Sequence, residues 1–278
     1  MKKIKAFFKL TRPVNVLIGC LSIFIGSFIA GSLQPLVKVI LAALSGGIIA
    51  AAANSINDYY DVNIDKINKP YRPIPAGYIT CKEAFLFSII LFIIGSILGA
   101  LINWIAFSIV IFACVVLYLY SARLKRTVLW GNLAVSLMSA FAFIYGGVAV
   151  NRLNAALIPA GFAFLFHFGR EIIKDVEDQK GDLADNAKTL PLQYGAKTAF
   201  GVTTLIFVIL IFTTFLPYIF NIFGFIYLVT VILGVDLVVI YVLISMWKNP
   251  QPANLGRLST ILKIDMLMGL IAIYVGRL

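Results

Sequence analysis

Long apolar runs separated by short polar stretches recur along the whole chain. A helix needs roughly 20 apolar residues to cross the hydrocarbon core of a bilayer, and nine runs approach this length. They lie at residues 14–33, 36–57, 84–103, 105–121, 128–150, 155–174, 198–217, 222–247 and 260–276. The pattern predicts one all-α domain, residues 1–278, in which nine transmembrane helices form a polytopic membrane bundle. The first run is too long for a cleavable signal peptide, and no small-residue cleavage site follows it.

The composition excludes most other classes of protein. Of the 278 residues, 61% are hydrophobic and 13% are charged, whereas soluble domains contain about 45–50% apolar and about 25% charged residues. This excludes a soluble enzyme, a secreted disulfide scaffold and a disordered chain. The cysteines Cys20, Cys81 and Cys114 lie far apart and form no zinc motif. A chain with a single histidine cannot build a histidine-based metal site.

The cations lie mainly on one side of the predicted membrane. If the nine spans alternate in direction, 20 of the 23 Lys and Arg residues fall on one face, and only Lys38, Arg152 and Arg277 fall on the other. The positive-inside rule makes the basic face cytoplasmic. We therefore expect a multi-pass protein of the cell membrane with its amino terminus in the cytoplasm and its carboxyl terminus outside. The net charge of +11 reflects this topology, and no nucleic-acid partner is expected.

Two long loops contain most of the acids. These loops, at about residues 58–83 and 170–197, lie on the predicted cytoplasmic face, and all twelve acids except Asp236 and Asp265 lie in or beside them. Long loops in compact domains are usually functional. The active site is therefore expected on the cytoplasmic face.

Each of these loops begins with polar residues on one predicted helix face, because one residue advances a helix by about 100°. The first motif contains Asn54, Asn57, Asp58, Asp61 and Asp65, and the second contains Glu171, Asp175, Asp178 and Asp182. If each helix continues through its motif, Glu177 points to the opposite side and His167 lies beside the acidic face. A solvated helix end is the alternative, but acids gathered on one face of a membrane helix favour a functional site.

Carboxylates that face one another repel unless cations lie between them. Oxygen ligands without a thiol or imidazole cluster favour Mg²⁺, which proteins typically hold with a few carboxylates and the phosphates of a substrate. Cations that suit a phosphate border the same face, namely Lys66, Lys69, Arg72, Lys125, Arg126, Arg170 and Lys174. The motifs therefore predict a site for magnesium and a diphosphate.

The order of residues after the first motif recurs after the second. Asn68, Lys69, Pro70, Gly77 and Lys82 follow Asp65, and Asn186, Lys188, Pro191, Gly195 and Lys197 follow Asp182, which lies 117 residues later. We interpret this recurrence as two pseudo-repeated four-helix halves plus a ninth helix.

Together these residues resemble the signatures of the UbiA-type intramembrane prenyltransferases. Asn57-Asp58-x-x-Asp61-x-x-x-Asp65, followed by Asn68-Lys69-Pro70-x-Arg72-Pro73, resembles the first signature, and Asp175-x-x-Asp178-x-x-x-Asp182 resembles the second. Arg12-Pro13-x-Asn15 and Tyr120-Ser121 with Lys125-Arg126 also resemble the family, which usually spaces this Tyr and Lys one residue closer. The resemblance covers the chain end to end. It implies a bundle of nine helices around a central cavity that binds a prenyl diphosphate through Mg²⁺.

Residues 169–182 are most similar to the archaeal branch of this family, the geranylgeranylglycerol-phosphate geranylgeranyltransferases of ether-lipid synthesis. This likeness implies transfer of a geranylgeranyl group from its diphosphate to the hydroxyl of a lipid-phosphate acceptor, geranylgeranylglyceryl phosphate. The expected surroundings are membrane lipids, and no protein partner is implied. Two alternatives stay open, which are prenylation of an aromatic or quinone-precursor acceptor and, outside the enzymes, a membrane transporter.

The resemblance and the motifs together suggest a role for each candidate residue. Two Mg²⁺ ions are expected on Asn57, Asp61, Asp65, Asp178 and Asp182. The catalytic candidates are Asp58, Asp61, Asp175 and Asp178. The substrate-binding candidates are Arg12, Asn15, Asn54, Lys69, Arg72, Tyr120, Lys125, Arg126, Arg170 and Lys174.

Three further polar residues lie outside these assignments. His167 is expected to be hydrogen-bonded to the neighbouring Arg170 and Glu171, as a lone histidine on a helix usually is. Asp236 is either a buried contact between two helices or a cavity residue. Asp265 is expected to pair with Lys263 near the cytoplasmic end of the last span.

Overall fold

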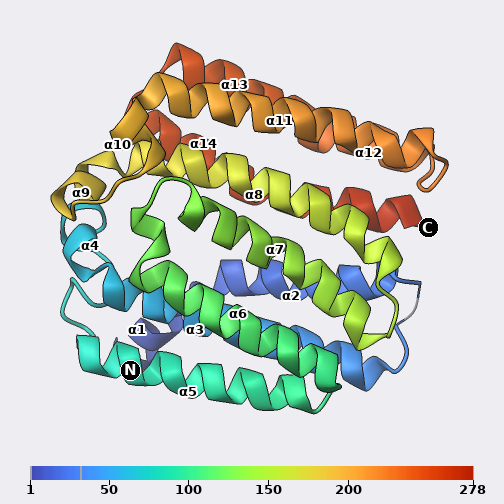
Figure 1. Cartoon of the computed structure of the whole chain (residues 1–278), viewed down its shortest axis with the longest axis horizontal. Coiled ribbons are helices and arrows are strands. Elements are labelled where there is room, and N and C mark those ends of the chain that lie inside the picture. Colours follow the sequence, from blue (N-terminus) through green and yellow to red (C-terminus); the bar gives the residue numbers. More distant parts are fainter. Residues whose placement is uncertain (1, 32, 278) are drawn as a thin grey trace.

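The computed structural model describes residues 2–31 and 33–277. These residues fold into a bundle of helices and contain no strand. The long helices run side by side along one axis, and the short helices α4, α9 and α10 gather at one end (Figure 1). The elements are α1 (Lys2–Leu10), α2 (Pro13–Ile29), α3 (Leu36–Tyr60), α4 (Val62–Asn68), α5 (Cys81–Ala100), α6 (Trp104–Ala122), η1 (Leu124–Arg126), α7 (Trp130–Ala149), η2 (Asn154–Ala156), α8 (Leu157–Glu177), α9 (Gln179–Ala184), α10 (Leu190–Tyr194), α11 (Ala196–Ile219), α12 (Phe225–Val231), η3 (Ile232–Asp236), α13 (Leu237–Lys248) and α14 (Pro252–Arg277). The predicted all-α class is confirmed.

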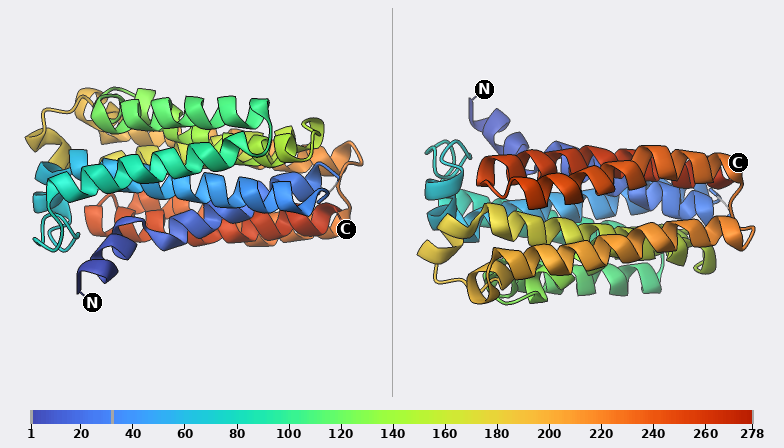
Figure 2. Two further views of the ribbon diagram at one scale, coloured as in Figure 1. Left: turned by 90° about the horizontal axis from the view of Figure 1, so that it is seen from below. Right: turned by 90° about the horizontal axis from the view of Figure 1, so that it is seen from above.

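Within the described residues, eight spans are long and apolar enough to cross a membrane, and a ninth is reached if α1 and α2 count as one bent span. The axes of α1 and α2 differ by 45°, and α1 leans out of the bundle (Figure 2). The bend falls at Arg12, which has a φ of 52°. This left-handed conformation is uncommon for a residue other than glycine.

Three predicted spans differ most from the observed helices. The first, 14–33, ends earlier because α2 stops at Ile29, and its residue 32 lies outside the described part of the chain. The eighth, 222–247, contains a π-helical turn, η3, between α12 and α13. The last was predicted from residue 260, but α14 begins at Pro252. A proline is compatible with the first turn of a helix, where its missing N–H has no partner to lose.

Two glycines allow α2 and α7 to pack closely. A Cβ atom added to Gly26 would overlap the backbone of Phe143, and one added to Gly146 would overlap the backbone of Ile23. The hydroxyl of Ser27 on α2 donates to the carbonyl of Gly146 at 2.8 Å. Small residues at a contact between membrane helices let the two backbones approach. The contact therefore joins the first half of the chain to the second.

The two halves share one pattern at their acidic motifs. A long helix ends just before Asp61 or Asp178, and a short helix, α4 or α9, follows. Both aspartates have nearly the same backbone angles, with φ and ψ of −90° and 2° for Asp61 and −89° and 6° for Asp178. This likeness supports the predicted repeat. The expectation that one helix continues through each motif was wrong, because the helix breaks at the second acid of the first motif and at Asp178 of the second.

Candidate active site

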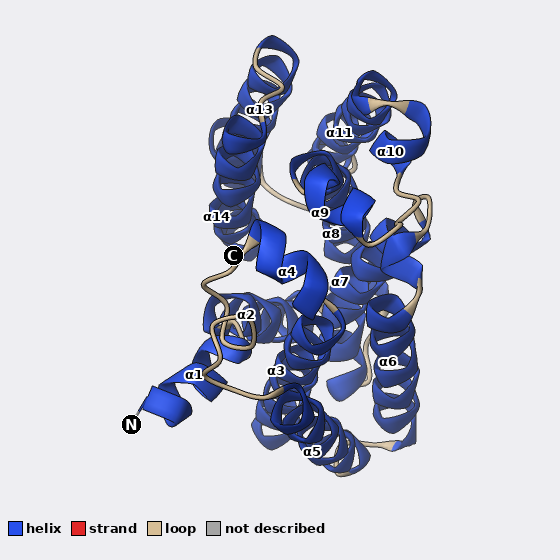
Figure 3. Ribbon diagram, turned by 90° about the vertical axis from the view of Figure 1, so that its left-hand side faces the viewer, coloured by secondary structure: helices blue, strands red, loops and turns tan. Residues whose placement is uncertain are grey.

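A cavity of about 650 Å³ unites the two acidic motifs. Seen from the end where the short helices lie, α4 and α9 cross over the bundle and the long helices surround them (Figure 3). The deeper wall of this cavity is mainly apolar and includes Ile18, Ile49, Val110 and Phe143. The predicted site residues that line the cavity are Arg12, Asn15, Asn54, Asn57, Asp61, Asp65, Lys69, Arg72, Tyr120, Lys125, Arg170, Lys174, Asp175, Asp178 and Asp182.

Arg72 joins two buried carboxylates of the first motif. Its Nη1 lies 3.1 Å from Asp58 Oδ1 and 2.6 Å from Asp65 Oδ2. Asp58 also forms an ion pair with Arg12 at the bend between α1 and α2. Burial raises the pKa of Asp65 above its usual value, although Arg72 acts in the opposite direction. The neutralising contacts of Arg72 are therefore needed to keep these acids charged inside the protein.

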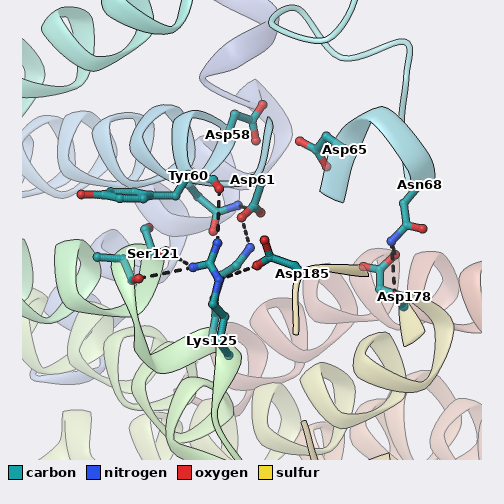
Figure 4. Close-up of polar contacts among 12 residues, drawn as sticks. Asp58, Tyr60, Asp61, Asp65, Asn68, Ser121, Lys125, Asp178 and Asp185 are labelled. Atoms are coloured by element: carbon teal, nitrogen blue, oxygen red, sulfur yellow. Dashed lines mark hydrogen bonds and ion pairs between the residues drawn. The ribbon is translucent and has the colours of Figure 1, made fainter. Parts of the chain in front are cut away.

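Asp61 lies at the junction of α3 and α4 and faces the second half of the bundle. It forms an ion pair with Lys125, which follows α6 (Figure 4). The amide of Asn57 donates to Asp61 Oδ2 at 2.8 Å. The other amide atom, Asn57 Oδ1, is buried and accepts no hydrogen bond from any described residue. An oxygen ligand is therefore free beside a carboxylate.

The second motif receives side chains from the first half. Lys69 Nζ lies 3.1 Å from Asp178 Oδ2, and Asn68 Nδ2 donates to Asp178 Oδ1 at 3.3 Å. These contacts bring the end of α4 against the start of α9. Burial, and then the neighbouring Asp178 carboxylate, raise the pKa of Asp182 to about 6. Asp182 forms no ion pair within the described residues, so a cation near it would favour its charged form.

A group of cations lies on the α8 and α14 side of the cavity. Glu171 accepts from Arg170 at 2.9 Å and from Lys174 at 2.7 Å. Arg170 Nε also donates to the carbonyl of Ser259 on α14 at 3.2 Å. Lys263, from the next turn of α14, lines the same side. Two cations therefore pair with Glu171, and a third, Lys263, lines the same cavity.

Two predicted site residues lie outside the cavity lining. Asp58 is buried behind it, between Arg12 and Arg72. Arg126 Nε donates to Asp185 at 2.5 Å, and its Nη atoms donate to the carbonyls of Ser121 and Tyr60. Arg126 therefore lies outside the cavity lining in this structure, and its role in substrate binding stays a prediction. Four hydrogen bonds from its guanidinium group connect η1 to α3, to the end of α6 and to the segment after α9.

Four predictions for neighbouring polar residues also need correction or completion. Glu177, expected on the far side of its helix, lines the cavity beside Gly256. Arg170 and Glu171 bind each other and not His167, which also lines the cavity. Asp265 is buried within α14 and forms no ion pair with Lys263. Asp236 accepts from Thr214 on α11 at 3.2 Å, so it is the contact between helices.

Sequence reasoning missed two residues that shape the site. Asn132 Nδ2 donates to Asp175 Oδ2 at 2.7 Å across the contact between α7 and α8. The available signal was an amide close to the start of an otherwise apolar run. Lys263 was predicted only as a topology-determining cation and as the partner of Asp265, because its contact with the cavity depends on how α14 packs.

The donor set fits magnesium bound together with phosphates. Among the described residues, no three His, Cys, Asp or Glu side chains form a ready metal cage. Mg²⁺ needs no such cage, because one or two carboxylates, waters and substrate phosphates usually complete its shell. The unpaired oxygen of Asn57 and the neighbouring carboxylates of Asp178 and Asp182 are ligands of the required kind.

Comparison with known proteins extends this picture. The model of the UbiA prenyltransferase family matches residues 19–262. The digeranylgeranylglyceryl phosphate synthase of Methanosphaera stadtmanae is 34% identical over 272 residues, which cover 98% of this chain and 99% of the relative. A solved structure described as digeranylgeranylglyceryl phosphate synthase in membranes is also 34% identical, with a TM-score of 0.78 over 100% of this chain and 99% of that one.

A more distant structure shares the fold. A UbiA homologue from Archaeoglobus fulgidus, bound to DMAPP and Mg²⁺, has a TM-score of 0.68 and 21% identity over 97% of this chain and 99% of that chain. The family match covers most of the chain, and the apolar helices make it a multi-pass membrane protein. The family match favours a prenyltransferase over a membrane transporter. The chain belongs to the UbiA prenyltransferase family.

Proposed function

We propose that this protein transfers a geranylgeranyl group from its diphosphate to the free hydroxyl of geranylgeranylglyceryl phosphate. The observation that carries the proposal is the meeting of two acidic motifs and their cations at one end of a largely apolar cavity. The named function of the relatives that match nearly the whole chain supports the choice of substrates. Because both halves contribute to one cavity, we infer that residues 1–278 act as a single domain.

The diphosphate is held between the two motifs. Asn57, Asp61 and Asp65 on one side and Asp178 and Asp182 on the other are the residues that would hold two Mg²⁺ ions. When bound, the ions supply neutralising charge for the departing diphosphate. Lys69, Arg72 and Lys125 now pair with Asp178, Asp65 and Asp61. Phosphate oxygens attract the same ammonium and guanidinium groups.

Two further aspartates, Asp58 and Asp175, support the residues that hold the metal and the diphosphate. Asp58 orients Arg12 and Arg72 from behind the cavity. Asp175 is oriented by Asn132 and lines the cavity one turn below Asp178. Tyr120 and Phe143 lie on the wall below the motifs. Their ring faces stabilise the allylic cation that forms when the bond to the diphosphate breaks, and the apolar wall keeps water from it.

The acceptor phosphate is placed near Arg170, Lys174 and Lys263. A second anion beside a diphosphate is strongly repelled at low dielectric, so it needs cations of its own. We expect Arg170→Gln to raise the KM for geranylgeranylglyceryl phosphate about tenfold, equivalent to about 1.4 kcal/mol. The KM for the prenyl diphosphate should change little. Lys180→Gln, which removes an exposed cation from α9, is the matched control, and an unchanged acceptor KM in Arg170→Gln contradicts the placement.

A direct test uses labelled geranylgeranyl diphosphate with a panel of acceptors. The purified protein should prenylate geranylgeranylglyceryl phosphate in the presence of Mg²⁺, and chelation of the metal should stop the reaction. The dephosphorylated acceptor should react poorly. If an aromatic acceptor reacts faster than the lipid phosphate, the quinone-precursor alternative replaces this proposal.

We infer that the site faces the cytoplasm, because the basic loops lie at the end of the bundle that carries α4 and α9. In a cysteine-free background, Lys188→Cys should be labelled by an impermeant thiol reagent only from the cytoplasmic side. Arg152→Cys, at the other end, should be labelled only from outside. Both positions are exposed. The reverse labelling pattern contradicts the inferred orientation.

A further inference from the structure

A second, smaller chamber adjoins the main cavity. Its volume is about 80 Å³, and apolar side chains of α8, α11, α12, η3 and α14 form most of its wall. We call it the side chamber. The residues that line both spaces are Ile18, Ser22, Phe143, Ala163, His167 and Met266.

Most polar groups of the side chamber already have partners. The hydroxyl of Ser22 donates to the carbonyl of Ile18 at 2.9 Å, and that of Tyr227 donates to the carbonyl of Thr214 at 2.8 Å. The hydroxyl of Thr214 is bonded to the carbonyl of Ile211 at 2.6 Å and lies within reach of Asp236. Among the polar side chains that line the chamber, only His167 and Asp265 form no hydrogen bond with the described residues.

The carboxyl group of Asp265 needs a donor in the chamber. Asp265 is 4% exposed, and its Oδ2 is completely buried without a hydrogen-bond partner. Leaving such a group unpaired is unfavourable, because it has lost its hydrogen bonds to water without gaining others. The imidazole N–H of His167 is a donor on the same chamber, and the volume has room for water between them. A carboxylate that accepts from one imidazole nitrogen leaves the other nitrogen free to act as a base.

His167 lies on the wall of the main cavity, one turn of α8 below Arg170, which is proposed to bind the acceptor phosphate. It is two turns below Asp175 on α8, roughly 12 Å along the helix axis. A prenyl diphosphate held by the motifs points its first carbon away from them, toward the apolar wall. Among the acids nearer the motifs, Asp61, Asp65 and Asp178 pair with cations, Asp175 accepts from Asn132, and Asp182 is assigned to the metal. His167 is thus an unengaged base on the described wall below Arg170.

We propose that His167 accepts the proton that the acceptor hydroxyl loses, and that Asp265 orients its ring from the side chamber. This inference rests on the proposed transfer to a hydroxyl. In the step, the bond between the first prenyl carbon and the diphosphate breaks, and its electron pair leaves with the diphosphate. The acceptor oxygen bonds to that carbon, and its O–H proton moves to the unprotonated nitrogen of His167. The proton then passes to solvent through the main cavity.

The test separates ionisation of the diphosphate from proton removal. Oxygen-18 in the bridging position of geranylgeranyl diphosphate scrambles to non-bridging positions whenever the carbon–oxygen bond breaks and re-forms, even with an acceptor analogue that lacks the hydroxyl. We expect His167→Ala to scramble like the wild type and to transfer the prenyl group about 100-fold more slowly. An acceptor with a thiol in place of the hydroxyl ionises without a strong base, so it should restore the rate of His167→Ala to within tenfold of the wild type.

Asp265→Asn should lower kcat about tenfold and leave the acceptor KM unchanged, because the carboxylate orients the ring without touching the substrate. Asp236→Asn makes the same change in the neighbouring span, and Ser22→Ala removes a satisfied hydroxyl at the same junction. Both should stay within twofold of the wild type.

Three results overturn the inference alone: normal transfer by His167→Ala, equal loss of scrambling and transfer in that variant, or equal effects of Asp265→Asn and Asp236→Asn. A wild-type protein that neither scrambles nor transfers overturns the proposed function and this inference with it.

Discussion

Asp182→Ala is expected to lower prenyl transfer by about 10³-fold while the protein stays folded. The variant removes one of the oxygen ligands that would neutralise the departing diphosphate, and loss of one such electrostatic contact typically costs 10²–10³-fold in rate. No ion pair is broken, since Asp182 has none within the described residues. Transfer of the labelled prenyl group, measured beside Glu83→Ala as the control, checks the loss. Glu83 pairs with Lys3 at the start of α5, outside the cavity lining.

The same variant should melt at a higher temperature than the wild type near neutral pH. The pKa of Asp182 is raised to about 6 in the folded protein, so the folded state binds this proton more tightly than the unfolded chain does. Stability is then lost as the pH rises toward 6 and stays lower above it. Alanine removes this penalty, and the difference in melting temperature should vanish as the pH falls to about 4. An active Asp182→Ala variant contradicts the metal-ligand assignment, and an equal melting temperature at every pH contradicts the account of its burial.

Arg72→Ala should both inactivate and destabilise the protein. Asp58 and Asp65 are each about 2% exposed, and the guanidinium group of Arg72 contacts both. Removing one partner from a buried ion pair leaves an uncompensated charge, which typically costs about 3–5 kcal/mol. Asp58 keeps Arg12, so we expect a loss near the lower value, about 3 kcal/mol. Thermal unfolding in detergent and the transfer assay measure the two effects.

A double variant distinguishes loss of charge balance from general damage. Arg72→Ala combined with Asp65→Asn should recover much of the stability, because the unpaired carboxylate is gone, but it should stay inactive. Lys66→Ala removes an exposed cation from α4, the short helix that contains Asp65. This variant should change neither stability nor activity. If the double variant is no more stable than Arg72→Ala, the ion pair with Asp65 is not the cause of the destabilisation.

The spans could be predicted from the sequence because the signal is local. A run of about 20 apolar residues matches the thickness of a bilayer whatever its neighbours are. The acidic motifs could be placed together for a similar reason, since their spacing and their resemblance to a family are properties of contiguous segments. The end of α2 and the start of α14 differ from the prediction because helix ends depend on caps and prolines in polar sequence.

The partners of the acids were decided by the tertiary structure. Lys69 reaches Asp178, and Lys125 reaches Asp61, across contacts between segments far apart in the chain. The breaks at Asp61 and Asp178 turn α4 and α9 over the cavity and bring these partners together.

Arg126 and Asp265 show the limit most clearly. Arg126 has the charge and the sequence position expected of a substrate ligand, yet it donates to Asp185 and to backbone carbonyls. Asp265 stands two residues from Lys263, yet the two point to different environments because α14 packs one face on the side chamber. Local patterns in the amino-acid sequence were enough to predict the membrane class, the apolar spans and the two acidic motifs. Only the packing of the helices decided which charges meet, because an ion pair or a cavity wall depends on distances between segments that no local pattern encodes.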